Sequence, residues 1–193
     1  MEISHPSFNK SEIMQRFYGV EVVIVEREPI LDRVESLGIE YERKYGGCSQ
    51  CVIGAIRDTF GGIDDSVFKA ATGLAGGVGL TGATCGALTG AAMAIGAFLG
   101  REYDQFADPE RIRFTTFELV RRMVARFEQE YGSTLCRHIQ EKIMGRSYKL
   151  YDEGEHKAFI EAGGHDDKCP VVVGKAARWV AEILLEEGLV QGH

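Results

Sequence analysis

The sequence predicts an all-α protein: a compact single-domain helical bundle with a buried central helix rich in Gly and Ala. Residues 70–100 are nearly free of charge, and Gly82, Gly86 and Gly90 recur four apart, which is helical spacing. The flanking segments carry apolar residues three and four apart between Gly or Pro residues, as amphipathic helices do. A chain of 193 residues is long enough for one well-cored domain.

The central segment is expected to be a helix buried on every side. Glycine inside a helix costs about 1 kcal/mol relative to alanine, so repeated glycines indicate close approach by a neighbouring backbone. Met93, Ile95 and Phe98 make the far end of the segment apolar all round. Cys85 lies near the predicted start of the helix, where unsatisfied N–H groups favour a thiolate. We therefore expect one reactive sulfur on this helix.

Two other interpretations of this segment are rejected. A membrane span needs about 20 predominantly apolar residues, and this stretch is too short and too rich in Gly and Thr. Residues 77–82 spell GxGxxG, the dinucleotide-binding fingerprint, which is meaningful only after a strand in a βαβ unit. Residues 64–72 instead predict a helix capped by Asp64 or Asp65 and ended by Gly73. We interpret the match as a coincidence of high glycine content.

Charge and composition exclude several function classes. A net charge of -7 argues against binding to nucleic acid or to an anionic membrane surface. The N-terminus shows no apolar run behind a basic region, so we expect no secretory signal and a cytoplasmic location. In a reducing compartment the five cysteines are more naturally metal ligands, redox thiols or buried apolar residues than a disulfide framework.

The chain divides into an N-terminal extension, residues 1–30, and a cysteine-bearing helical domain, residues 31–193. Residues 20–25 form a β-branched run that fits a short strand or part of a helix, because periodicity cannot separate the two in so short a run. A lone strand would need a partner, which a second copy of the chain could provide.

Apolar stripes and helix-ending residues predict the remaining helices. The first follows Pro29 and stops at Gly46-Gly47, the second begins at Cys48, and a long one follows the capping sequence at residues 108–110. A short helix holds Cys136, another lies near residues 153–161, and the last opens at Cys169-Pro170. The residues expected to face inward are Ile30, Val34, Leu37 and Tyr41; Val52, Ile53, Ile56 and Phe60; Phe117, Val120, Val124, Phe127 and Tyr131; and Val173, Ala176, Val180 and Ile183.

All five cysteines therefore fall at or just inside the N-terminus of a predicted helix: Cys48 with Cys51, Cys85, Cys136 and Cys169. Converging helix N-termini form a positive pocket that can hold thiolates or an anionic iron-sulfur cluster. The simpler alternative is that each cysteine is a small, buried and inert apolar residue. This alternative could explain any single cysteine, but it explains less well why all of them lie at helix N-termini.

These residues resemble a known family of redox-active proteins, named for the signature C_GCAxxG_C_C. Its elements occur in order as Cys48 in GGCSQCVIGAI, residues 85–90 in CGALTG, Cys136 after FEQEYGSTL and Cys169 in DKCPVVV. The resemblance spans about residues 31–188, and the chain is also similar to the cluster-bearing part of split-Soret cytochromes. It implies a small helical redox protein, an iron-sulfur centre and a homodimer. The chain departs from the signature in reading Cys-Gly-Ala for Gly-Cys-Ala and in the additional Cys51.

The sequence supports one leading hypothesis and leaves two others open. The first is an electron-transfer protein whose iron-sulfur cluster is held by cysteines and which exchanges electrons with an unknown partner protein. The second is a dithiol oxidoreductase using Cys48, Cys51 or Cys85, and the third a non-catalytic protein held together by zinc. A c-type haem is excluded because Val52 stands where haem attachment needs His. Residues expected at the cofactor are Cys48, Cys85, Cys136 and Cys169 as ligands matching the signature, Cys51 as a further ligand, and His138 or His165 as neighbours.

Overall fold

The structure is a computed structural model that describes residues 27–191, and this part of the chain is helical without any strand. The predicted all-α fold is confirmed, whereas the strand predicted over residues 20–25 lies outside the described residues. In chain order the helices are α2 (Arg27–Tyr45), α3 (Cys48–Phe60), α4 (Asp65–Ala70), the short 3-10 helix η1 (Ala71–Leu74), α5 (Gly86–Phe98), η2 (Tyr103–Gln105), α6 (Ile112–Tyr131), α7 (Cys136–Met144), α8 (Glu153–Glu161), the π-helical turn η3 (Gly164–Lys168) and α9 (Cys169–Glu186).

Helix α5 lies at the centre of the bundle, but the prediction that it is buried on every side is wrong, because Ala97 is exposed and Met93 and Phe98 are only half-buried. It contacts α3, α6 and α9, and its Ala91, Ala94 and Ile95 are fully buried. The helix begins at Gly86 instead of Gly82, which has a positive φ of 75° and belongs to the preceding loop. Residues 27–191 contain no helix whose length and apolar character would let it span a bilayer.

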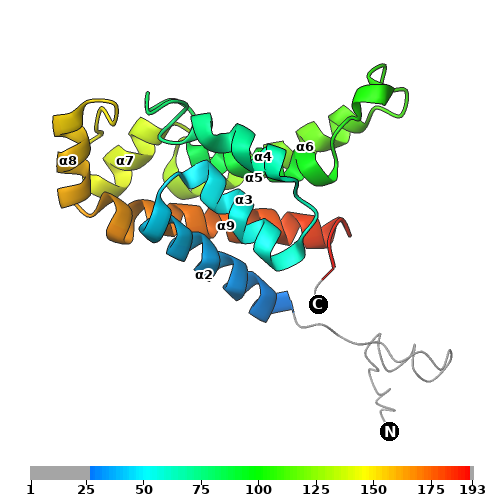
Figure 1. Ribbon diagram of the computed structural model, residues 1–193, viewed down its shortest axis with the longest axis horizontal. Coiled ribbons are helices and arrows are strands. Elements are labelled where there is room, and N and C mark those ends of the chain that lie inside the picture. Colours follow the sequence, from blue (N-terminus) through cyan, green and yellow to red (C-terminus); the bar gives the residue numbers. More distant parts are fainter. Residues whose placement is uncertain (1–26, 192–193) are drawn as a thin grey trace, which may run out of the picture.

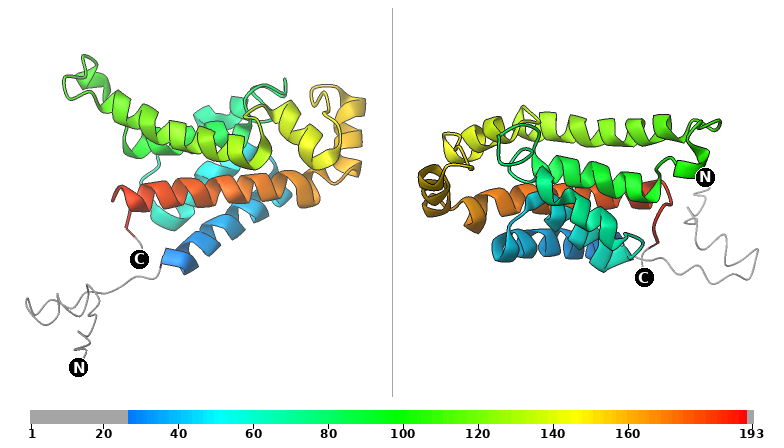
Figure 2. Two further views of the ribbon diagram at one scale, coloured as in Figure 1. Left: turned by 180° about the vertical axis from the view of Figure 1, so that it is seen from behind. Right: turned by 45° about the horizontal axis from the view of Figure 1, so that its top comes forward.

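Helices α2 and α9 lie against each other along one side of the bundle (Figures 1 and 2). Small residues let them approach closely, since a Cβ on Gly38 would lie 3.2 Å from both Ala177 Cβ and Gly174 Cα. Arg178 of α9 adds ion pairs to Glu28 at 2.5 Å and to Asp32 at 2.7 Å. These contacts fix the α9 N-terminus, which carries Cys169, relative to the end of α2.

The buried face of α6 differs from the prediction. Leu119, Met123, Phe127 and Tyr131 are buried, but Phe117 is 52% exposed. The reason is visible in Figure 1, where the first part of α6 and the segment before it project from the bundle, so no other helix of residues 27–191 covers Phe117. The predicted cap is present in a looser form, because Asp108 accepts a hydrogen bond from the Ile112 N–H at 2.7 Å although the helix begins three residues after Pro109.

Candidate functional site

Four cysteines stand at the starts of four different helices. Cys48, Cys136 and Cys169 are the first residues of α3, α7 and α9, and Cys85 is the N-cap of α5. Local sequence explains these starts: the left-handed Gly47 stands immediately before Cys48, and proline follows Cys169 within the first turn of α9. The predicted helix-terminal positions are therefore confirmed.

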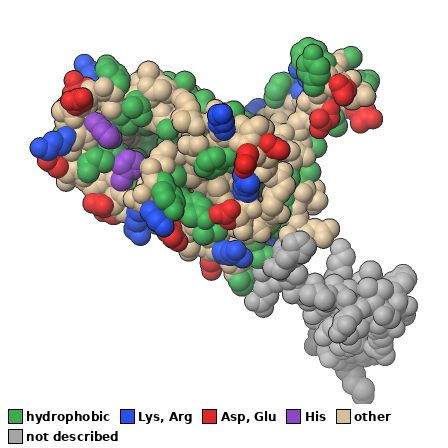
Figure 3. All heavy atoms as spheres, in the orientation of Figure 1, with side chains coloured by type: hydrophobic (Ala, Val, Ile, Leu, Met, Phe, Trp, Pro, Cys, Tyr) green, Lys and Arg blue, Asp and Glu red, His purple; other side chains and the backbone are tan. Residues whose placement is uncertain are grey.

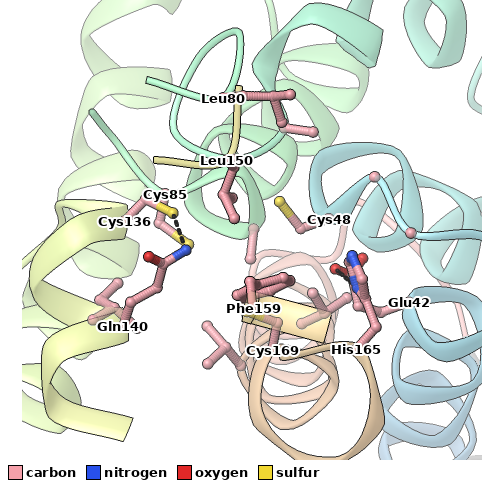
Figure 4. Close-up of a pocket in the computed structure, with 18 of the residues that line it drawn as sticks. Glu42, Cys48, Leu80, Cys85, Cys136, Gln140, Leu150, Phe159, His165 and Cys169 are labelled. Carbon is pink, nitrogen blue, oxygen red and sulfur yellow. Dashed lines mark hydrogen bonds and ion pairs between the residues drawn. The ribbon is translucent and has the colours of Figure 1, made fainter. Parts of the chain in front are cut away.

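These four cysteines line one cavity of about 290 Å³ (Figure 4). Most of the wall is apolar, and the space-filling view shows histidine side chains beside a hollow at that end of the molecule (Figure 3). The apolar lining residues are Ala75, Leu80, Ala87, Ile139, Leu150, Phe159, Val172 and Val173. The fold thus gathers four thiols from distant parts of the chain around one mainly apolar space.

Cys85 and Cys136 are held together by their backbones. Thr84 and Leu135 form an isolated antiparallel bridge between the segments that lead into α5 and α7. The Cys136 N–H donates to Ala83 O at 2.7 Å, and the Cys85 N–H donates to Thr134 O at 2.9 Å. The two helix starts are consequently fixed side by side, with both thiols at one side of the cavity (Figure 4).

Cys48 approaches the start of α5 through a glycine. A Cβ placed on Gly86 would overlap the Cys48 sulfur and lie 3.0 Å from Leu74 O, so only glycine leaves room for this sulfur. The loop between η1 and α5 contributes Leu80 to the wall, and Val78 and Leu80 both have positive φ, which non-glycine residues rarely adopt. The GxGxxG stretch is thus a loop that closes the cavity, with no preceding strand.

Cys51 is the one predicted site residue among the five cysteines that does not line this cavity. Its thiol donates a hydrogen bond to Gly46 O at 3.0 Å. It borders a separate surface hollow with Tyr41, Gln50 and Phe68. Although Cys51 lies one turn after Cys48 in α3, the tight packing at the start of the helix directs the two sulfurs into different surroundings.

Burial keeps the cavity thiols protonated. Burial raises the pKa of the Cys85 and Cys136 thiols to about 12, and it also raises the pKa of Cys48 and Cys169. Backbone N–H groups at the helix starts act in the other direction: those of Ala87 and Leu88 lower the pKa of Cys85. The expected thiolate stabilisation at the helix N-terminus is therefore present but smaller than the effect of burial.

The sequence reasoning missed two buried polar residues of the wall, Glu42 and Gln140, each 2% exposed. Gln140 accepts a hydrogen bond from the Tyr148 N–H at 2.9 Å, and its amide lies 3.7 Å from the Cys136 sulfur. The buried face of α2 runs through Leu31, Val34, Gly38 and Glu42, one position off the predicted stripe. The available signal for Glu42 was its spacing, because it lies four residues after Gly38 and therefore on the same buried face of the helix.

The three histidines within the described residues divide into two groups. His156 and His165 border the cavity, whereas His138 is not part of its wall and lies 3.1 Å from Ser133 Oγ through Nδ1. As placed, no three His, Cys, Asp or Glu side chains within residues 27–191 are close enough to bind a single metal ion. Thiolates are the ligands of iron-sulfur clusters, so the four cavity cysteines match the donor chemistry of a cluster, and the cavity gives it room.

The comparisons with known proteins agree with this arrangement. One family model, described as "Putative redox-active protein (C_GCAxxG_C_C)", matches residues 47–183, well over half of the chain. Neither the curated proteins nor the solved structures contain a significant match. The matched region begins one residue before Cys48 and ends in α9, and it includes all four cysteines of the cavity. The chain therefore belongs to the C_GCAxxG_C_C family of redox-active proteins.

Proposed function

We propose that this redox-active protein transfers electrons through an iron-sulfur cluster held by Cys48, Cys85, Cys136 and Cys169. The observation that carries the proposal is the convergence of these four thiols on one cavity. When bound, the cluster would accept or donate one electron at a time. The apolar wall, which includes Leu80, excludes water and so influences the reduction potential.

The size of the cavity favours a cluster over zinc. A structural zinc ion binds four ligands at about 2.0–2.3 Å, so its donors must almost touch one another. Within the described residues no three potential donors are placed for one ion, and about 290 Å³ of space lies among the thiols. A cluster has a volume of its own and can bridge thiols that a single ion could reach only if the helices moved.

Helix electrostatics favour an anionic group in this cavity. The N-terminus of each helix carries a partial positive charge of roughly half an elementary charge. Helices α3, α5 and α9 have 13, 13 and 18 residues, and each presents its N-terminus to the cavity through a cysteine. Their combined field offsets part of the negative charge that four thiolates and a cluster bring into an apolar space.

The dithiol alternative is less well supported. A nucleophilic cysteine needs a lowered pKa and some access to solvent, whereas burial raises the pKa of the Cys48, Cys51 and Cys85 thiols. Cys51 also faces a different hollow from the other two. The homodimer, the cytoplasmic location, the partner protein and the division at residue 30 stay predictions.

The proposal is tested by analysing protein prepared without oxygen. We expect brown protein that contains both iron and acid-labile sulfide, because thiolates gathered in a positive, mainly apolar cavity are suited to an iron-sulfur cluster. Metal and sulfide analysis with visible absorption measures this, after reconstitution with iron and sulfide if the isolated protein is colourless. Zinc without sulfide, or metal-free protein with titratable thiols after reconstitution, would disprove the cluster.

Cluster assembly should become more favourable as pH rises. The pKa of Cys85 and Cys136 is raised to about 12, so near neutral pH both thiols hold protons that iron must displace. Removing each proton costs about 1.4 kcal/mol less for every unit by which pH rises towards that pKa. Iron uptake at limiting iron should therefore increase between about pH 7 and 9, with an unchanged slope in Cys51→Ser. Uptake independent of pH would contradict this expectation.

A further inference from the structure

Glu42 is a buried carboxylate on the wall of the thiol cavity. It lies in the last turns of α2, and its side chain is 3% exposed. Its Oε2 has no hydrogen-bond partner among the described residues. Figure 4 shows Glu42 beside His165, at the side of the cavity away from Cys85 and Cys136. A carboxylate oxygen buried without a partner is costly, so this position calls for a binding partner within the cavity.

The Cys51 thiol interacts with the Glu42 carboxylate, which raises the pKa of Cys51, but no basic side chain around Glu42 pairs with Oε2, which has no hydrogen-bond partner among the described residues. His165 Nδ1 lies 3.2 Å from Glu42 Oε1, but this nitrogen also makes no hydrogen bond. Among residues 27–191, no lysine or arginine lines the cavity. The neighbouring Arg43 turns away and donates through Nε to Asp166 O at 2.7 Å. Oε2 is thus an oxygen atom able to bind a metal, and it faces thiols instead of a basic side chain.

The carboxylate also works against thiolates in this cavity. Next to burial, the charge of Glu42 is the strongest influence that raises the pKa of Cys48 and Cys169. Four thiolates and a carboxylate around one space repel one another unless a positive centre lies among them. Bound iron would reduce this repulsion, because its positive charge would offset part of the negative charge of the thiolates and it would bind the free carboxylate oxygen.

We propose that Glu42 is an oxygen ligand of the metal centre, binding iron through Oε2, and that His165 positions its carboxylate. This inference rests on the proposed function and extends it from an all-cysteine site to a mixed thiolate and carboxylate site. Mixed ligand sets occur in iron-sulfur proteins, as in Rieske centres, where two histidines replace two cysteines. The partners that hold ligating side chains in place are themselves important for metal affinity.

The test compares two charge-removing variants in the same helix, made in the full-length chain and reconstituted without oxygen. Glu42→Gln removes the buried carboxylate, and Glu40→Gln removes an exposed one two residues earlier. We expect Glu42→Gln to lower iron affinity by more than the roughly 10- to 100-fold that outer-shell partners contribute, and to change the Mössbauer spectrum of the iron that remains. Glu40→Gln should match the wild-type protein in both measurements.

The outcomes separate this inference from the proposed function. Wild-type protein without iron and sulfide would disprove the cluster itself. Wild-type iron content and an unchanged spectrum in Glu42→Gln would disprove only the ligand role, even if the reduction potential moved through the lost charge. If circular dichroism shows that Glu42→Gln does not fold, Glu42→Leu replaces it. That variant also removes the carboxylate, so a wild-type spectrum would again overturn the ligand role.

Discussion

Serine at Cys48, Cys85, Cys136 or Cys169 is expected to remove most or all of the iron from the protein, whereas Cys51→Ser should leave it largely in place. The first four thiols line one cavity, and a serine hydroxyl is a much poorer ligand for iron-sulfur clusters than a thiolate. The thiol of Cys51 instead donates to Gly46 O and borders another hollow. Iron and sulfide content, with visible absorption, should be measured on all five variants side by side.

Cys51→Ser serves as the matched control in this series, because it lies one turn after Cys48 in the same helix and removes the same atom. Circular dichroism on each variant distinguishes loss of the cluster from loss of the fold. The assignment is wrong if Cys51→Ser loses the iron while Cys48→Ser keeps it. The second sulfur of the CxxC would then be the principal ligand, and α3 would have to turn to bring it to the cavity.

Gly90→Ala is expected to destabilise the protein by about 3 kcal/mol or more, the upper range for overpacking a close contact. A Cβ at Gly90 would lie 2.8 Å from Ser49 Cα and would overlap the Ser49 carbonyl oxygen. These are backbone atoms of α3, so no change of side-chain rotamer can relieve the clash. Chemical denaturation of the metal-free protein followed by circular dichroism measures the loss.

Gly96→Ala is the matched control for this prediction. Gly96 lies in the same helix, and a Cβ there would meet nothing within 4 Å outside the helix's own backbone. Alanine should therefore stabilise α5 by up to about 1 kcal/mol, which is its ordinary helical advantage over glycine. Equal effects at the two positions would show that α3 does not press against α5 at Gly90.

Much of the fold and the positions of the cysteines could be predicted from local sequence signals. Gly46-Gly47 ends one helix just before Cys48, and Cys169-Pro170 opens another, so each cysteine is placed by its immediate neighbours. A close backbone contact of α5 was also foreseeable, because repeated glycines in a helix indicate a backbone nearby, but the sequence did not indicate that α3 makes it. These features depend on a few adjacent residues or on one periodic pattern.

The features that sequence reasoning missed depend on packing between distant segments. The burial of Glu42 follows from a small rotation of α2 against α9, which changes the face in contact by one position. Phe117 was expected to be buried because its spacing fits the stripe, but no other helix in the described part of the chain covers it where α6 projects. The separation of Cys51 from Cys48 likewise results from tertiary contacts at the start of α3. Helical periodicity in the sequence does not predict such contacts.

The structure gives a physical reason for the order Cys-Gly-Ala at residues 85–87, which inverts the first two residues of Gly-Cys-Ala. The family signature writes Gly-Cys-Ala, which would put a cysteine at position 86. In this chain a Cβ at position 86 would overlap the Cys48 sulfur, so the present packing tolerates only glycine there. Moving the cysteine one position earlier, to Cys85, keeps a thiol at the same cavity and places it beside Cys136.

The placement of four cysteines on four helices would also make the proposed cluster a cross-link of the chain. Cys48 stands near the beginning of the described sequence and Cys169 near its end, with Cys85 and Cys136 between them. A group that joins all four closes three long loops at once, and closing such loops removes conformational freedom mainly from the unfolded chain. Because the four cysteines line one cavity only in the folded state, binding of the proposed cluster and folding would be thermodynamically linked. An oxidant that dismantled the cluster would therefore act as a destabiliser of the whole bundle.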